Sequence, residues 1–175
     1  MSDEKMHILL VFCALGIILV QAEIDLIIDD CICEANDEYI APGSCIMEVN
    51  DDSEVGSTVN TRLEIIKPIP DESVMKVSLK GFHMGEYSLD SGFNVEMPFC
   101  EVFGNEDLFY DLIVNGLGIS DATCPMEVGV YGSEKFYPDI SAWPDHFPPG
   151  KYMADVGFFD EDELILRLKL YATLQ

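Results

Sequence analysis

The sequence predicts an all-β domain, a β-sandwich or β-cup of about seven to nine antiparallel strands with one short helix. Two observations lead to this class. Apolar and polar residues alternate with a period of two in several separate segments of the 175-residue chain. Proline, glycine, asparagine and aspartate, which favour turns, stand between these segments. Because 49% of the residues are hydrophobic, the chain can also bury a core.

Five segments carry the alternation most clearly: residues 59–65, 74–80, 93–99, 152–158 and 164–174. Pro68 and Pro70 separate the first two, which we expect to be antiparallel neighbours. Ser91-Gly92 is expected to form the turn before the third. The acidic run 160–163 is expected to join the last two in a hairpin.

One segment departs from the strand pattern and predicts a short helix over about residues 106–114. Its apolar residues, among them Leu108 and Leu112, are spaced as on one helix face. Asn105 is a possible N-cap, and Gly116 would end the helix.

The first 22 residues are typical of a secretory signal peptide, which leaves residues 23–175 as a single domain. Ile8 to Val20 is an uncharged stretch of 13 residues, preceded by Lys5 and followed by a small residue, Ala22. A membrane-spanning helix needs about 20 apolar residues, so this stretch is too short to be a stable anchor. We therefore expect the protein to be secreted and extracellular.

The charge of the chain excludes two classes of partner. With 33 acidic and 9 basic residues, the formal net charge is −24. Nucleic-acid binding depends on clustered lysine and arginine, and no segment of the sequence has such a cluster. A polybasic attachment to anionic membranes is excluded for the same reason.

Five cysteines follow the predicted signal peptide, and an oxidising compartment favours disulfides between them. Cys31 and Cys33 are too close to bridge each other and lie on one face of a strand. We expect either of them to pair with Cys45 across a hairpin, and Cys100 to pair with Cys124. A zinc site is disfavoured because the spacing lacks a Cys-x2-Cys pair.

No catalytic motif is visible in the sequence, and we expect no enzyme, no cofactor and no metal. After the predicted signal peptide the histidines are His83 and His146, and no Gly-x-Ser-x-Gly motif occurs. A secreted hydrolase would need one of these histidines in a cleft beside a nucleophile. Acidic runs at residues 29–30, 51–54 and 160–163 lack the spacing of an EF-hand and are better explained as solvated turns.

A set of short motifs in the C-terminal half carries a family resemblance. They are Pro98-Phe99-Cys100, Cys124-Pro125, Gly129-Val130-Tyr131, Tyr137-Pro138-Asp139 and Pro148-Pro149-Gly150-Lys151-Tyr152. Their order resembles the secreted ML lipid-recognition superfamily, in particular its ganglioside-activator-like branch and the related insect chemosensory secreted proteins. The first half of the chain resembles it only through the strand pattern. No cysteine follows Cys124, so the C-terminal cysteine of the activator has no counterpart.

The resemblance implies a non-enzymatic protein whose two sheets enclose an apolar cavity for a lipid or another hydrophobic small molecule. It also implies the Cys100–Cys124 pair. The candidate roles are chemosensory detection, of pheromone or gustatory type, and lipid presentation, with a receptor as a possible second partner. The candidates for the cavity wall are Met75, Val77, Leu79, Phe93, Val95, Met97, Phe99, Val156, Leu166, Leu168 and Leu170. For each of them, solid core is an equal or better explanation.

An alternative function needs no cavity. An immunoglobulin-like sandwich could recognise a protein or receptor through its loops. It would have a solid core, and a continuous void above about 300 Å³ would speak against it.

Overall fold

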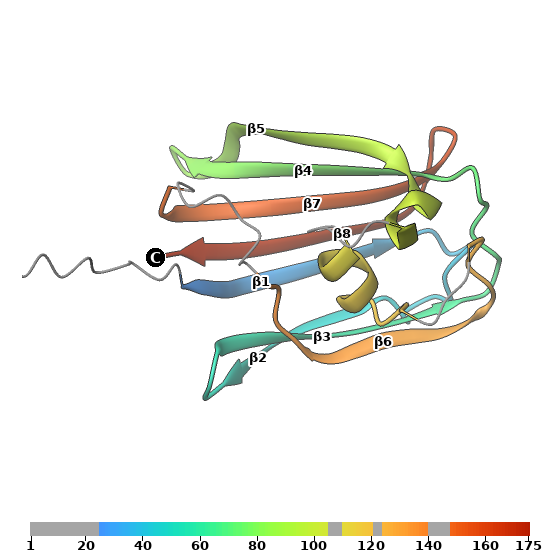
Figure 1. The fold of residues 1–175 in the computed structure, drawn as a ribbon, viewed down its shortest axis with the longest axis horizontal. Helices are drawn as coiled ribbons and strands as arrows, with labels where there is room; N and C mark the ends of the chain where they lie inside the picture. Colours follow the sequence, from blue (N-terminus) through green and yellow to red (C-terminus); the bar gives the residue numbers. More distant parts are fainter. Residues whose placement is uncertain (1–24, 105–109, 121–123, 140–147) are drawn as a thin grey trace, which may run out of the picture.

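The computed structural model describes residues 25–104, 110–120, 124–139 and 148–175. Within these residues, eight strands form two antiparallel sheets (Figure 1). The five-stranded sheet has the order β1 (Leu26–Ala35), β8 (Glu163–Leu174), β7 (Gly150–Asp160), β4 (Val74–His83) and β5 (Glu86–Pro98). The three-stranded sheet has the order β2 (Ile46–Asp52), β3 (Gly56–Ile65) and β6 (Gly129–Phe136). The predicted all-β, two-sheet class is confirmed.

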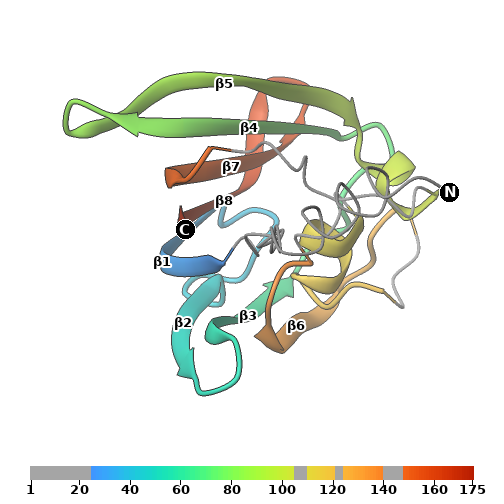
Figure 2. The same cartoon turned by 60° about the vertical axis from the view of Figure 1, so that its left-hand side comes forward.

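Two short helical segments lie between β5 and β6 on the side of the molecule opposite β1 and β2 (Figure 2). They are η1, a 3₁₀ segment (Phe99–Gly104), and η2, a π-helical segment (Tyr110–Asn115). The helix predicted over residues 106–114 is found only in its second half, as η2. Gly116 follows it, as expected, whereas residues 106–109 and the proposed N-cap Asn105 lie outside the described residues.

The main core lies between the two sheets and continues against η1 and η2. Its largest fully buried side chains include Tyr39, Phe99, Phe158 and Ile165, each at most 2% exposed. In the alternation of residues 164–174, Ile165 falls on the face shared with Arg167 and Lys169. It is buried nevertheless, because β8 bulges there: Phe158 pairs with Leu166 and Phe159 with Leu164, which leaves Ile165 unpaired and in the core beside Leu166.

All five predicted strands are present, but the expected pairing of the first two is wrong. β3 pairs with β2 and β6, whereas β4 pairs with β5 and β7 in the other sheet. Residues 66–73 carry the chain from one sheet to the other. Pro68 and Pro70 have no N–H to extend a ladder there, and Ile69 forms an isolated bridge with Met126.

The expected turn at Ser91-Gly92 is also wrong, because β5 continues through it as a bulge. The register with β4 shifts between Ser78, opposite Asn94, and Lys80, opposite Asp90. Gly92 has a φ of 78°, and its N–H donates to Asp90 Oδ1 at 2.8 Å. This hydrogen bond lowers the pKa of Asp90. The turn that opens β5 lies earlier, at residues 84–85. The hairpin of β7 and β8 through the acidic turn is confirmed.

The predicted signal peptide, residues 1–22, lies outside the described residues. Within the described parts of the chain, no helix is long and apolar enough to cross a membrane.

Candidate binding site between the two sheets

Cys33 and Cys45 form a disulfide that links the two sheets. Cys33 lies on β1, and Cys45 immediately precedes β2, which belongs to the other sheet. The sequence did not decide whether Cys31 or Cys33 pairs with Cys45, and the structure shows that it is Cys33. The expected hairpin between them is wrong, because the disulfide spans two sheets. Ile28 N also donates to Ser57 Oγ at 2.7 Å, so β1 is fastened to the three-stranded sheet at a second point.

Cys100 and Cys124 form the second predicted disulfide. It joins η1, directly after β5, to the segment that leads into β6. The two disulfides therefore hold opposite sides of the sandwich, one at β1 and the other at η1.

Among the cysteines that the structure describes, Cys31 is the free one, and it is half-buried. Burial, together with the charges of Asp30 and Glu48, raises the pKa of its thiol from 9.0 to about 11. The thiolate is the reactive form, so near pH 9 it should be about fiftyfold rarer in the folded chain than in the unfolded chain.

We therefore expect native Cys31 to react with iodoacetamide near pH 9 at least about tenfold more slowly than in denaturant. The rate should still rise toward pH 11, as the thiol of the folded chain ionises. Alkylation followed by peptide mass spectrometry measures both rates. Equal rates in the native and unfolded chain would contradict the shifted pKa.

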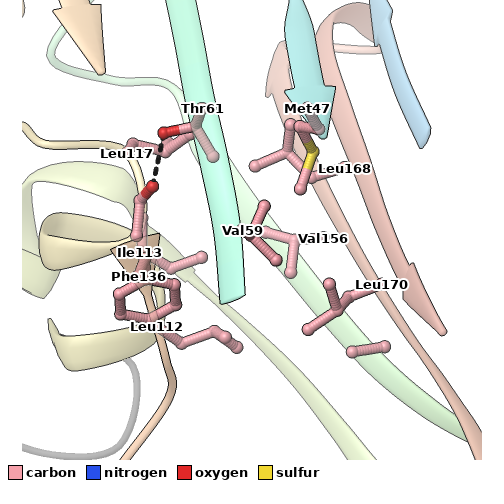
Figure 3. A pocket seen from close by; sticks show the side chains of 12 residues that line it. Met47, Val59, Thr61, Leu112, Ile113, Leu117, Phe136, Val156, Leu168 and Leu170 are labelled. Atoms are coloured by element: carbon pink, nitrogen blue, oxygen red, sulfur yellow. Dashed lines mark hydrogen bonds between the residues drawn. The ribbon is translucent and has the colours of Figure 1, made fainter. Parts of the chain in front are cut away.

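A small cavity of about 40 Å³ lies between the sheets, beside η2 (Figure 3). The three-stranded sheet and the five-stranded sheet supply opposite walls, and η2 with the residues after it supplies a third. Val59 and Val156 point toward one another across it (Figure 3). The lining residues are Met47, Val59, Thr61, Leu112, Ile113, Gly116, Leu117, Phe136, Ala154, Val156, Leu168 and Leu170.

Thr61 contributes the one polar side chain of this lining, and its hydroxyl group is satisfied. Thr61 Oγ1 donates to the carbonyl oxygen of Gly116 at 2.7 Å, and it accepts from Ser133 N at 3.1 Å. No polar side chain of the lining therefore needs a ligand or a water. An apolar cavity of this kind stays dry and favours apolar ligands.

The same hydrogen bond fastens the end of η2 to the three-stranded sheet. Gly118 reinforces the attachment, since a Cβ there would lie 1.9 Å from the carbonyl oxygen of Gly132 on β6. Asp111 Oδ2 also accepts from Asp139 N at 2.9 Å. Across the cavity, η2 faces the five-stranded sheet with the apolar side chains of Leu112 and Ile113.

The structure brings three of the eleven predicted wall residues to this cavity: Val156, Leu168 and Leu170. Four others are packed deep in the main core: Met75, Val77, Phe99 and Leu166. Leu79 is buried, at 9% exposure. Phe93 and Met97 are half-buried against the core from β5, and Val95 is half-buried on β5 opposite Val77.

Sequence reasoning did not propose the other lining residues. Val59 and Thr61 belong to a strand that alternation had identified, but nothing local shows that this face lies opposite β7 and β8. Leu112 was recognised on the apolar face of the predicted helix, which was the available signal for the third wall. Ala154 shares the alternating face of Val156 but was not proposed as a wall residue, and Phe136 carried no signal.

The remaining candidates for chemistry do not form a site in the described structure. The acidic runs 51–54 and 160–163 include turns, as expected, whereas the expected turn at 29–30 is wrong because these residues lie within β1. The N–H of Glu54 donates to Asp52 Oδ1 at 2.9 Å and lowers the pKa of that carboxyl group. Among the described residues, no three of His, Cys, Asp or Glu are placed to hold a metal ion. His83 is exposed at the end of β4 rather than in a cleft, and His146 lies outside the described residues.

Fold and site together define a two-sheet β-protein with a small apolar cavity closed on one side by a helical segment. A model of the family "Protein of unknown function (DUF1091)" matches residues 76–154, fewer than half of the 175 residues. Over β4, β5, η1, η2, β6 and the start of β7, the chain is therefore similar to that family. The matched region includes η2 but leaves out β3 and β8, which carry two cavity walls.

A crystal structure of a Niemann-Pick type C2 protein from Japanese carpenter ant is similar to this chain at 14% sequence identity. The similarity covers 85% of this chain and 92% of that one, with a TM-score of 0.31. The fold class follows from the strand order of the two sheets. No curated protein matches the chain.

Proposed function

We propose that the protein is a secreted, non-enzymatic carrier that binds a lipid or another hydrophobic small molecule between its two sheets. The observation that supports this most is the apolar cavity beside η2, lined from both sheets and with its polar side chain already satisfied. A site with this lining favours apolar ligands and contains no side chain free to act as a nucleophile, an acid or a base.

The size of the cavity determines how a ligand would enter. A void of about 40 Å³ costs only about 1 kcal/mol at roughly 24 cal/mol per Å³. A preformed ligand pocket of about 300 Å³ would cost on the order of 7 kcal/mol, comparable to the whole stability of many domains. The free protein therefore rests nearly closed, and the sheets part as an apolar chain replaces their mutual contacts.

The side on which the sheets part follows from their connections. β1 is held to the three-stranded sheet by the Cys33–Cys45 disulfide and by the hydrogen bond from Ile28 to Ser57. η2 is held to the three-stranded sheet through Thr61, but it meets the five-stranded sheet across the cavity through apolar side chains. The Cys100–Cys124 disulfide ties the opposite side of the sandwich at η1. We infer that the ligand enters between η2 and β7, where neither disulfide lies and only apolar side chains meet.

The proposal predicts that filling the cavity weakens uptake of a fluorescent fatty acid. Ala154 lines the cavity on β7, so Ala154→Phe should weaken binding at least about tenfold, because interiors are close-packed and leave no room for both groups. Leu170→Ala enlarges the same cavity and should retain uptake. Saturable fluorescence titration measures each affinity.

Lys151→Phe is the matched control, because it adds the same ring to an exposed position of the same strand. It should bind like the wild type, and circular dichroism should show that all variants are folded. Uptake that is unaffected by Ala154→Phe, or absent from the wild type, would contradict the proposal.

The small volume also favours a second candidate, an immunoglobulin-like module without a ligand cavity that recognises a protein or receptor through its loops. This candidate predicts no saturable uptake of fatty acid by any variant. The same titration therefore separates the two functions.

Secretion is proposed from the sequence of residues 1–22 and is supported by the two disulfides, which persist in oxidising compartments. We propose residues 23–175 as one domain and an extracellular location. Chemosensory detection and lipid presentation, with a receptor as partner, remain the candidate roles suggested by the resemblance of the sequence to secreted lipid-recognition proteins.

A further inference from the structure

The hairpin of β4 and β5 projects beyond the strands beside it (Figure 2). The last pair between β4 and β7 joins Gly81 to Tyr152, whereas the hairpin continues through the pairs Phe82–Tyr87 and His83–Glu86. Residues 82–86 are all exposed. The tip is thus a narrow protrusion rather than part of a flat face.

The side chains on this protrusion are unusually apolar for an exposed turn. Met84 is 92% exposed, Leu89 is 57% exposed and Phe82 is 44% exposed. Phe82 and Leu89 lie on opposite faces of the hairpin, since Phe82 pairs with Tyr87 while Leu89 lies beside Gly81. Apolar surface therefore surrounds the tip.

The backbone of the turn is also strained. Met84 has a φ of 51° and Gly85 a φ of 97°, the two positive values that a type I′ hairpin turn requires. Asn-Gly is the favoured pair for this turn, and a methionine at positive φ is strained. Because the Met84 side chain is almost fully exposed, packing within the chain does not compensate for the strain.

The charge distribution indicates what covers the tip. Residues 79–89 contain one basic residue, Lys80, and one acidic residue, Glu86, with His83 between them. This stretch is neutral in a chain with a net charge of −24, so it is a part of the surface that phosphate headgroups would not repel. A stable protein interface draws on about 20–30 residues of each partner, whereas the exposed tip spans residues 82–86.

The base of the hairpin fits the same environment. Tyr87 is half-buried, with its ring 5.0 Å from that of Phe82 and 5.1 Å from that of Tyr171. Tyrosine is enriched at membrane–water interfaces because one end of it is apolar and the other is polar. With the apolar tip among the acyl chains, the tyrosines at the base of the hairpin would lie at the level of the headgroups.

We propose that the β4–β5 tip inserts Met84, Phe82 and Leu89 into the interface of a phospholipid membrane and docks the protein there. The tip is distinct from the cavity beside η2, and docking does not require that a ligand bind between the sheets. The proposed partner of the tip is a membrane surface made of zwitterionic phospholipids.

Flotation with phosphatidylcholine vesicles tests this docking. Met84→Asn removes the most exposed apolar side chain and installs the preferred Asn-Gly turn, so the variant should melt at the same temperature or higher. Its vesicle affinity should fall about tenfold or more, which is the value of burying one methionine side chain. Val130→Thr, which removes an apolar group 59% exposed on β6, should bind like the wild type.

Oxidation of Met84 by peroxide gives an independent readout in the unmodified protein. Met84 should oxidise rapidly in solution, since it is the methionine exposed at the tip, and vesicles should protect it. Met75 and Met126, at most 2% exposed, serve as internal references.

Equal flotation of wild type and Met84→Asn, or oxidation of Met84 unchanged by vesicles, would overturn the proposal. A wild type that stays off vesicles but self-associates through the tip would also overturn it. The two proposed sites can fail separately. Met84→Asn should keep the uptake of free fatty acid, and Ala154→Phe should keep vesicle binding.

Discussion

Replacing Phe158 with alanine is expected to lower the free energy of unfolding by about 3–5 kcal/mol. Phe158 on β7 is 1% exposed, and its ring lies edge-on to that of Phe99, 5.1 Å away. Phe99 in turn contacts Phe103 of η1, so the cavity left by the substitution would lie where the five-stranded sheet meets η1. Urea denaturation followed by circular dichroism measures the loss.

Phe159→Ala is the matched control, one residue further along the same strand. Phe159 is half-buried, and the Lys76 ammonium nitrogen lies 5.3 Å from its ring centroid. Because the side chain is partly solvated already, we expect a loss of about 1 kcal/mol. Similar losses for the two variants would contradict the assignment of Phe158 to the core.

Removing the second disulfide through Cys100→Ala together with Cys124→Ala is expected to cost about 3–4 kcal/mol. The two cysteines are 24 residues apart, and a cross-link across a loop of that length restricts the unfolded chain. The disulfide also fixes η1 against the segment before β6, so the loss should come with greater exposure of the core to the dye ANS. Denaturant melts of the oxidised proteins measure the difference.

Cys31→Ala is the control for this experiment, because Cys31 forms no disulfide. Its effect should stay within about 1 kcal/mol. A double variant no less stable than Cys31→Ala would show that the Cys100–Cys124 disulfide does not stabilise the fold.

Local pattern was sufficient to predict the strands with clear alternation. β4, β7 and β8 were identified because one face of each is apolar and the other polar. β1 was expected only around Cys31 and Cys33, and its full extent was not predicted, because its sequence does not alternate cleanly and its register with β8 shifts between Ile28 and Asp30. β6 was missed as well, since it is an edge strand with two glycines and an exposed valine.

Which strands pair with each other, and which cysteines form a disulfide, could not be predicted from local pattern. The alternation of β3 and β4 shows which residues share a face, but not that residues 66–73 carry the chain to the other sheet. Cys31 and Cys33 point to the same face of β1, so only the position of Cys45 in the fold decides between them. The cavity forms only where both sheets and η2 come together, and the sequence does not show where that is. Val156 was therefore proposed as a wall residue, whereas Ala154, two residues away on the same strand, was not.

Native mass spectrometry of the protein secreted by cells tests most directly whether it carries a lipid between its sheets. We expect a chain that begins at Glu23, has two disulfides and one free thiol, and carries a lipid adduct that Ala154→Phe loses. A wild-type protein that is always free of adduct, and that takes up no fatty acid when it is offered, would contradict the proposed function.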